Sequence, residues 1–289
     1  MSFTLATDTS CDVFRTELKA RGIVYKPLSF IIDGEAYDDE FTSDAEYKGF
    51  YDKIRSGKMP TTSQINLAEH EEFFETLIKS CDNDILYLTL SSGLSGSYAT
   101  ACAAAKNIKE KTDRNIYVAD SLGATIATRI VLDEAERLRD SGVNAETAQA
   151  ELAEFVKHIH TWFTAVDLMH LKRGGRVSGP MAYLGTALNI KPVLFINKVG
   201  GLSVVQKTIG VSKAIAAMAS RFEKDSAKQP HKFYVASADA ESAEELLLKA
   251  KSIRPDCEGE IGWIGPVIGA HTGSGALGIS FLSDTERQI

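Results

Sequence analysis

Short apolar runs alternate with helix-forming segments along most of the chain, and this alternation restricts the fold more than any other feature of the sequence. The apolar runs are typical of buried strands and cover residues 3–6, 85–90, 116–118, 163–166, 193–196 and 233–236. Helical periodicity lies between most of them, at residues 73–78, 98–108, 125–138, 145–156 and 214–222. A regular exchange of strand and helix indicates an α/β fold with a largely parallel sheet flanked by helices.

The length of 289 residues suits two domains of ordinary size. The clearest change of organisation follows the long helical region, where a new strand is predicted. We therefore expect two α/β domains, covering residues 1–158 and 159–289. Residues 24–33 are rich in strand formers and end at the turn signal Asp33-Gly34, so a hairpin-like excursion is expected within the first domain.

Composition restricts the classes of partner and compartment. The formal net charge of −7 argues against nucleic acid, whose phosphates favour a basic surface. No apolar stretch approaches the roughly 20 residues that span a bilayer, and the N-terminus lacks the pattern of a signal peptide. The four cysteines are scattered without a C-x-x-C pair. We therefore expect a cytoplasmic protein with reduced thiols, no metal site and no cofactor.

A glycine-rich segment near the C-terminus raises the question of a nucleotide site. The sequence GSGALG at residues 273–278 matches the G-x-G-x-x-G fingerprint of dinucleotide-binding loops. Such a loop needs a helix and a second strand after it, whereas here a strand is predicted at residues 279–282 and the chain ends at Ile289. The dinucleotide interpretation is therefore excluded. His271 is expected in a turn between the strand-like pair Val267-Ile268 and the strand at residues 279–282.

Hydroxyl side chains follow the predicted strands. The loops at residues 7–10, 91–97 and 120–121 come directly after three of them. Because the carboxyl ends of parallel strands face one crevice, these loops are expected to converge. Gly93 and Gly96 allow close backbone approach, and a helix start beyond them offers N–H groups to an anionic oxygen. Helix capping by Ser95 is the alternative interpretation of this loop.

Six motifs taken together resemble the DegV family, in family order and at family spacing over nearly the whole chain. They are TDTS (7–10), TSQ (62–64), SSGLSGSY (91–98), RGGRVS (173–178), KPVL (191–194) and VIGAHTGSG (267–275). The resemblance implies two α/β domains with a long-chain fatty acid between them. It also implies a non-catalytic, fatty-acid-binding subunit of a bacterial fatty acid kinase, which presents the carboxyl group to a separate ATP-using kinase subunit.

The resemblance assigns roles to individual residues. Thr62, Ser95 and His271 match the family residues that hydrogen-bond the carboxylate. Residues expected to support that pocket are Asp8, Ser63, Gly93, Gly96, Thr272 and Gly273. Arg173 and Arg176 match a basic loop that contacts the kinase or the membrane surface. Ile209 occupies a position where members that serve the kinase often carry arginine, so binding is expected more firmly than phosphotransfer.

Two other functions remain open from the residues alone. A serine hydrolase would use Ser95 as nucleophile, His271 as base and Asp8 or Asp120 as orienting acid, although residues 93–97 lack the G-x-S-x-G spacing. A phosphorylated metabolite would also suit the hydroxyl-rich loop. An acyl chain instead requires an apolar tunnel. Candidate tunnel residues are Leu168, Met169, Leu184, Leu188, Ile190, Phe195 and Ile264.

Overall fold

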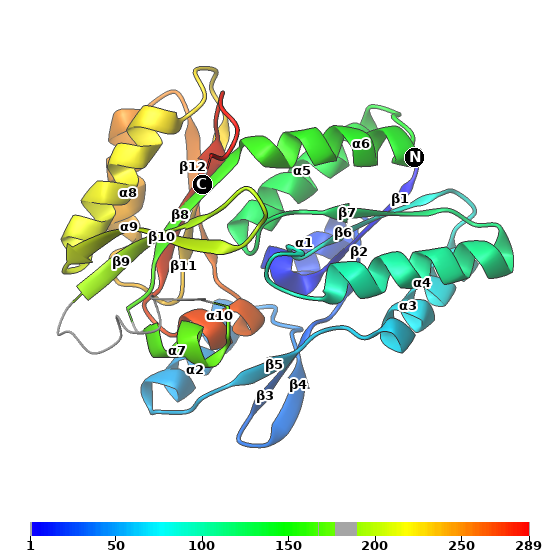
Figure 1. Ribbon diagram of the computed structural model, residues 1–289, viewed down its shortest axis with the longest axis horizontal. Helices are drawn as coiled ribbons and strands as arrows, with labels where there is room; N and C mark the ends of the chain where they lie inside the picture. The colour runs from blue at the N-terminus through cyan, green and yellow to red at the C-terminus, as the bar shows by residue number, and fades with distance from the viewer. Residues whose placement is uncertain (1, 167, 177–189, 289) are drawn as a thin grey trace.

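The computed structural model describes residues 2–166, 168–176 and 190–288 (Figure 1). The N-terminal half contains a four-stranded sheet of order β2-β1-β6-β7, and all its pairings are parallel. Its strands are β1 (Thr4–Asp8), β2 (Val24–Lys26), β6 (Ile85–Thr89) and β7 (Ile116–Asp120). The predicted parallel sheet flanked by helices is thus confirmed in this half.

Helices cover both faces of this sheet because its central strands are apolar on both sides. Tyr87 packs toward α3 (Leu67–Ser80) and α4 (Ser97–Thr112). Leu86 and Leu88, its neighbours on β6, pack with residues of α5 (Ile126–Asp140) and α6 (Ala145–Phe155). Strands buried on both faces read as continuous apolar runs, and this is why residues 85–90 were recognisable in the sequence.

A small antiparallel sheet of order β4-β3-β5 follows β2 in the chain. It consists of β3 (Ser29–Ile32), β4 (Glu35–Asp38) and β5 (Thr61–Ser63). The hairpin between β3 and β4 turns at Asp33 and Gly34, both with positive φ, as the turn signal predicts. Helix α2 (Asp44–Arg55) lies between β4 and β5 and leads toward the C-terminal half.

The C-terminal half contains a six-stranded sheet of order β10-β9-β8-β13-β11-β12. Its strands are β8 (Ile159–Thr164), β9 (Ile190–Ile196), β10 (Leu202–Ile209), β11 (Lys232–Ser237), β12 (Glu258–Trp263) and β13 (Leu277–Leu282). Only β11 and β12 pair in parallel. The other pairings are antiparallel, because β9 and β10 form a hairpin and β13 inserts antiparallel between β8 and β11. The sequence predicts the largely parallel sheet for the N-terminal domain and does not predict the pairing of this second sheet.

The faces of the six-stranded sheet differ in what covers them. Helices α8 (Val211–Asp225) and α9 (Ala243–Ile253) pack on one face, and α5 contacts the other (Figure 1). The shorter helices are α1 (Arg15–Ala20), α7 (Leu168–Arg173) and α10 (Pro266–Thr272), with 3₁₀ turns η1 (Thr9–Cys11) and η2 (Val156–His158). Helix α5 thus lies between the two large sheets.

Val267 and Ile268 belong to helix α10, so their assignment to a strand is wrong. Pro266 occupies the first turn of this helix, a position where its missing N–H costs nothing. An isolated apolar pair is compatible with either structure, and the proline sets the helix start. His271 therefore lies in the last turn of α10 rather than in a turn between strands.

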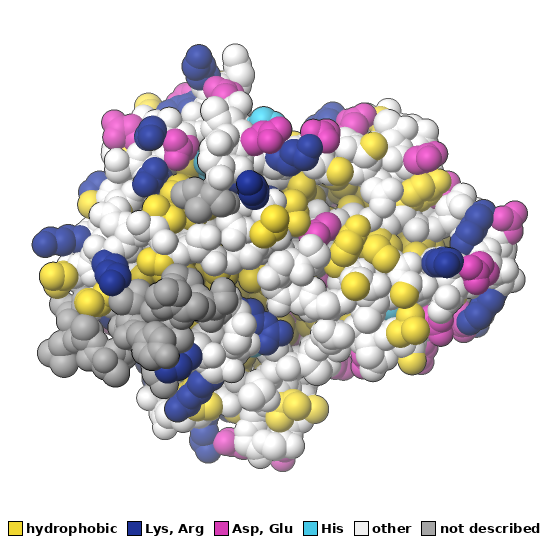
Figure 2. All heavy atoms as spheres, in the orientation of Figure 1, with side chains coloured by type: hydrophobic (Ala, Val, Ile, Leu, Met, Phe, Trp, Pro, Cys, Tyr) yellow, Lys and Arg dark blue, Asp and Glu magenta, His cyan; other side chains and the backbone are white. Residues whose placement is uncertain are grey.

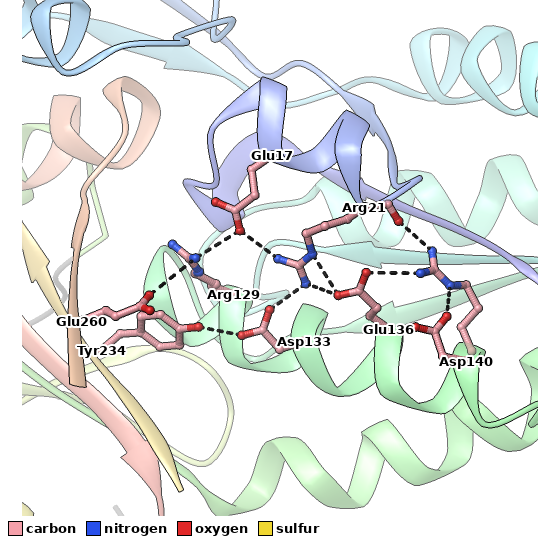
Figure 3. A network of polar contacts seen from close by, with 9 residues as sticks. Glu17, Arg21, Arg129, Asp133, Glu136, Asp140, Tyr234 and Glu260 are labelled. Atoms are coloured by element: carbon pink, nitrogen blue, oxygen red, sulfur yellow. Dashed lines mark hydrogen bonds and ion pairs between the residues drawn. The ribbon is translucent and has the colours of Figure 1, made fainter. Parts of the chain in front are cut away.

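Polar contacts fix α5 against both halves (Figure 3). The Arg129 guanidinium of α5 lies 3.1 Å from Glu17 of α1 and 4.8 Å from the Tyr234 ring centroid of β11. Tyr234 also donates a hydrogen bond of 2.8 Å to Asp133 of α5. All strands of the first two sheets precede Ile159, where the third sheet begins in the chain, and the division into domains 1–158 and 159–289 stays a prediction.

The surface in the same view is mixed in character. Figure 2 shows acidic and basic side chains mainly around the outer parts of this face, with hydrophobic side chains visible in the middle, where the halves meet. Hydrophobic side chains on this face thus lie in the region between the halves.

Candidate ligand-binding cavity

One cavity lies between the two halves. It is bounded by β5, residues 90–95, the start of α5, α10 and the inner face of the six-stranded sheet. About 890 Å³ of empty space lies between its lining residues, part of it open to solvent. Most lining residues are apolar: Leu28, Leu90, Leu94, Ala124, Ile126, Phe163, Leu171, Ile196, Leu202, Ala236, Ile264, Val267, Ile268 and Gly278. This mainly apolar lining with a few polar groups is typical of sites that bury a small molecule.

The cavity has two unlike ends. Its polar lining residues include Ser63, Gln64 and Arg176, whose side chains are exposed to solvent. At the sheet, the lining includes Ala236 and Gly278, which are buried. A Cβ on Gly278 would lie 2.9 Å from that of Phe163, so a side chain there would crowd the neighbouring strand β8. The arrangement joins a solvent-exposed polar end to a buried apolar end.

Thr62 and His271 meet at the polar end. Thr62 Oγ1 lies 2.8 Å from His271 Nε2, and both residues line the cavity. His271 Nδ1 is buried and has no hydrogen-bond partner in the described parts of the chain. Burial, with smaller contributions from Arg176 and His170, lowers the pKa of His271 from 6.5 to about 4. The imidazole is therefore neutral at pH 7 and carries one proton.

Ser95 serves two purposes at once. Its Oγ accepts a hydrogen bond from the Ser97 N–H at 3.2 Å and lies 3.0 Å from the Ser97 hydroxyl. Ser95 thus accepts from the first N–H of α4, but the N-cap residue is Gly96, so the helix-capping interpretation does not hold for this side chain. Ser95 also lines the cavity. When Ser97 donates to it, the Ser95 hydroxyl proton is free to point toward a ligand.

The two arginines of the predicted basic loop lie in different places. Arg176 lines the cavity, and its Nε donates to the Leu94 carbonyl at 3.2 Å. Arg173 is exposed and does not line the cavity. Among the described lining residues, Arg176 therefore supplies the positive charge at the polar end.

The supporting residues mostly shape the loop that carries Ser95. The buried Asp8 carboxylate accepts hydrogen bonds from the Leu90 N–H at 2.8 Å and from Ser10. A Cβ on Gly93 would lie 2.6 Å from the Gly201 nitrogen, so this loop packs closely on the β9–β10 turn. Gly96 similarly lies against the side chain of Gln64, a residue of the TSQ motif to which the sequence assigned no individual role.

The remaining supporting residues lie around α10. Ser63 and Thr272 line the cavity, and the Thr272 hydroxyl is buried without a described partner. Gly273 has φ of 74° and packs against the His170 ring. Thr125 is a lining residue that sequence reasoning missed: it precedes α5 with φ of 55°, rare for a β-branched residue. No local pattern marks that position.

Only part of the predicted tunnel lines the cavity. Ile264 does. Phe195 and Ile190 do not, and Phe195 packs on the opposite face of the sheet, with its ring 4.3 Å from that of Trp162. Alternate residues of a strand face opposite sides, and the sequence did not say which side was the cavity. The side chains of Leu168 and Met169, and residues Leu184 and Leu188, lie outside the described residues.

The contacts of a hydrolase triad are not formed among the described residues. His271 Nε2 faces Thr62 rather than Ser95. The Asp8 carboxylate accepts hydrogen bonds from the Ser10 and Leu90 N–H groups. The Asp120 carboxylate accepts hydrogen bonds from the Ser92 and Leu122 N–H groups. A serine nucleophile requires a base that is itself oriented by a third group, and this geometry supplies neither contact.

The described residues contain no group of three or more His, Cys, Asp or Glu side chains that could hold a metal ion. Among their helices, none combines the length and the hydropathy that crossing a membrane requires.

Comparisons with known proteins agree with the sequence motifs. A DegV domain-containing protein of Clostridium perfringens is 34% identical over 288 residues, which cover 99% of each chain. A crystal structure described as DegV, a fatty acid binding protein from Bacillus subtilis, has a TM-score of 0.84 and 30% identity, covering 98% of this chain and 100% of the other. A DegV family protein from Thermus thermophilus, described by its fatty acid binding, has a TM-score of 0.85 and 28% identity, again covering 98% and 100%. Residues 2–284 match the family model described as "Uncharacterised protein, DegV family", and the chain therefore belongs to the DegV family.

Proposed function

We propose that this protein binds a long-chain fatty acid, with the carboxylate at Thr62, Ser95 and His271 and the acyl chain in the apolar part of the cavity. The observation that carries the proposal is a single cavity that joins a polar, solvent-exposed end to a buried apolar end. The fatty acid binding described for the Bacillus subtilis and Thermus thermophilus relatives supports the same ligand class.

The polar end offers hydrogen-bond donors of the kind that a carboxylate requires. In the proposed tautomer, His271 Nε2–H donates to Thr62 Oγ1, which leaves the Thr62 hydroxyl proton for the ligand. The Ser95 hydroxyl supplies a second donor, and Arg176 adds positive charge nearby. Hydrogen bonds to an ionised carboxylate are stronger than those between neutral groups. His271 acts in this account mainly by orienting Thr62.

The apolar end favours an acyl chain over a phosphorylated metabolite. Burying a methylene group contributes about 0.8 kcal/mol. A sugar phosphate would instead place hydroxyl groups against Ala236, Ile264 and Gly278, where side chains offer no hydrogen bonds. The mainly apolar lining therefore supports a fatty acid as the ligand.

We further propose that the carboxyl group is presented to a separate kinase subunit for acyl-phosphate formation, with no independent catalysis by this chain. Support comes from the exposure of Ser63, Gln64 and Arg176 at the end of the cavity where the carboxylate would lie. Exposed Arg173 is proposed to contact the kinase or, transiently, a membrane surface. Ile209 is 64% exposed at a position where family members that serve the kinase often carry arginine. We therefore expect the lack of this arginine to affect transfer of the phosphoryl group more than fatty acid binding.

Equilibrium binding to delipidated protein tests the ligand class. Palmitate or oleate should displace a fluorescent fatty acid with one-to-one stoichiometry, while glucose 6-phosphate should displace nothing. Displacement by the sugar phosphate without displacement by either fatty acid would reject the proposal in favour of the phosphorylated metabolite.

A further inference from the structure

Two histidines and two glycines hold α7 and the residues after it against α10. The His170 ring of α7 lies against Gly273, where a Cβ would be 2.8 Å from the ring Cδ2. The His271 ring of α10 lies against Gly174, just beyond α7. Each histidine therefore packs on a glycine that the other segment supplies.

The contact between Gly174 and His271 leaves no room for a side chain. A Cβ on Gly174 would lie 3.0 Å from Cε1 and 3.2 Å from Cγ of the imidazole, and closer still to Nδ1. Such a Cβ would overlap the Nδ1 edge of the imidazole, so the ring would have to move. Gly175, the next residue, has nothing within 4 Å of the same position. The constraint is therefore specific to residue 174.

This packing determines which imidazole nitrogen is available. The Gly174 side of the ring holds Nδ1, which is buried and without a partner in the described structure. The opposite side holds Nε2, 2.8 Å from Thr62 Oγ1. His170 Nδ1 lies 3.2 Å from the carbonyl oxygen of Ala270, the residue before His271, and this contact holds α7 to α10. Rotation of the ring by half a turn about Cβ–Cγ would place the carbon Cε1 where Nε2 now lies and lose the hydrogen bond with Thr62.

We propose that Gly174 is a positioning residue of the head-group site: because it lacks a side chain, the backbone after α7 packs against the Nδ1 edge of His271 and keeps Nε2 against Thr62. Its expected effect on affinity rests on the proposed function, whereas its effect on the imidazole does not. The charged or titratable groups facing His271 are Arg176 and His170, both from the α7 segment, and the neutral Thr62 faces it from β5. Both neighbours are cationic when ionised. Exclusion of water from the ring and these positive charges therefore both lower the pKa of His271.

Nuclear magnetic resonance titration of the histidines tests the positioning without any ligand. In Gly174→Ala the displaced ring gains water, and the pKa of His271 should rise from about 4 toward 6.5. Gly49→Ala is the matched control, because nothing lies within 4 Å of a Cβ there. His170→Ala adds no atoms, loosens the same packing and should shift the pKa in the same direction. An unchanged His271 pKa in both test variants would overturn the proposal.

A double-mutant cycle then tests whether Gly174 acts through His271. Gly174→Ala should weaken fatty acid binding about 10-fold, the effect of losing one hydrogen bond to a charged group. In the His271→Ala background, the same substitution should have little further effect. An equal loss in both backgrounds would assign Gly174 a purely structural role. If the parent protein bound no fatty acid, the proposed function would fail, while the titration would still decide the positioning.

Discussion

Thr62 and His271 are 209 positions apart in the chain, yet their side chains approach within 2.8 Å at the polar end of one cavity. The contact depends on how α2 joins the halves. The Tyr47 ring of α2 stacks on Trp263 with centroids 5.2 Å apart, and Trp263 Nε1 donates a 2.6 Å hydrogen bond to Asp44. This docking places the following strand, β5, beside α10.

Substitution of Thr62 by valine should weaken fatty acid binding with little change in stability. Valine keeps the shape of the side chain and removes the hydroxyl that bonds His271 and, in the proposed complex, the carboxylate. A hydrogen bond to a charged group is worth about 1.5–3 kcal/mol, so a loss of roughly 10- to 150-fold is expected in a titration. Thr61→Val, at the exposed neighbouring position, is the matched control. Equal affinities for the two variants would contradict the assignment.

Substitution of Ala236 by leucine should shorten the acyl chain that the cavity accepts. The added side chain enters the buried apolar end, which Ala236 lines. Exclusion of about three methylene groups would cost about 2.4 kcal/mol, a roughly 50-fold loss for palmitate. Octanoate, measured in parallel, should lose much less affinity because its chain is shorter. Equal losses for both acids would place the chain elsewhere.

Histidine burial should make the protein less stable in mild acid. Burial lowers the pKa of both His70 and His271 from 6.5 to about 4. At these two histidines the unfolded chain therefore binds more protons than the folded chain between these values, and their contribution to the free energy of unfolding should fall as the pH drops from 6.5 to 4. Urea denaturation across this range measures the slope. His70→Gln should reduce it, and an unchanged slope would show that His70 is not held neutral.

Loss of the bond between Trp263 and Asp44 should loosen the docking of α2. Trp263→Phe keeps an aromatic ring beside Tyr47 but removes the indole donor. We expect the free energy of unfolding to fall by about 1 kcal/mol, together with weaker fatty acid binding, because α2 leads into β5. Denaturation and titration of the same sample check both effects. Weaker stability with unchanged binding would show that α2 docking does not position Thr62.

The N-terminal sheet was predictable from sequence because each of its buried strands is a compact apolar run followed by a helix. The six-stranded sheet was not, because its order depends on β13 inserting between β8 and β11, strands that are distant in the chain. Local periodicity carries no information on such pairing. The helix at Val267-Ile268 had a local signal, Pro266, but two apolar residues alone are ambiguous.

The candidate site was predictable where unusual residue types cluster. Ser95 and His271 lie in glycine- and hydroxyl-rich segments and were recognised by their chemistry and motifs. Thr125 and Thr161 also line the cavity, but Thr125 lies between Ala124 and Ile126 and Thr161 between His160 and Trp162, so neither belongs to a glycine- and hydroxyl-rich motif. The role of Gly174 depends on a contact with a ring 97 positions away in the chain and has no signature within its own segment.

Native mass spectrometry of the purified protein tests the central claim most directly. The protein should carry a long-chain fatty acid that denaturing extraction identifies, and the delipidated form should gain the mass of one palmitate or oleate when either is added. Thr62→Val and Ser95→Ala should retain less of it under identical conditions. A protein that is purified without lipid and gains no mass from either acid would contradict the account.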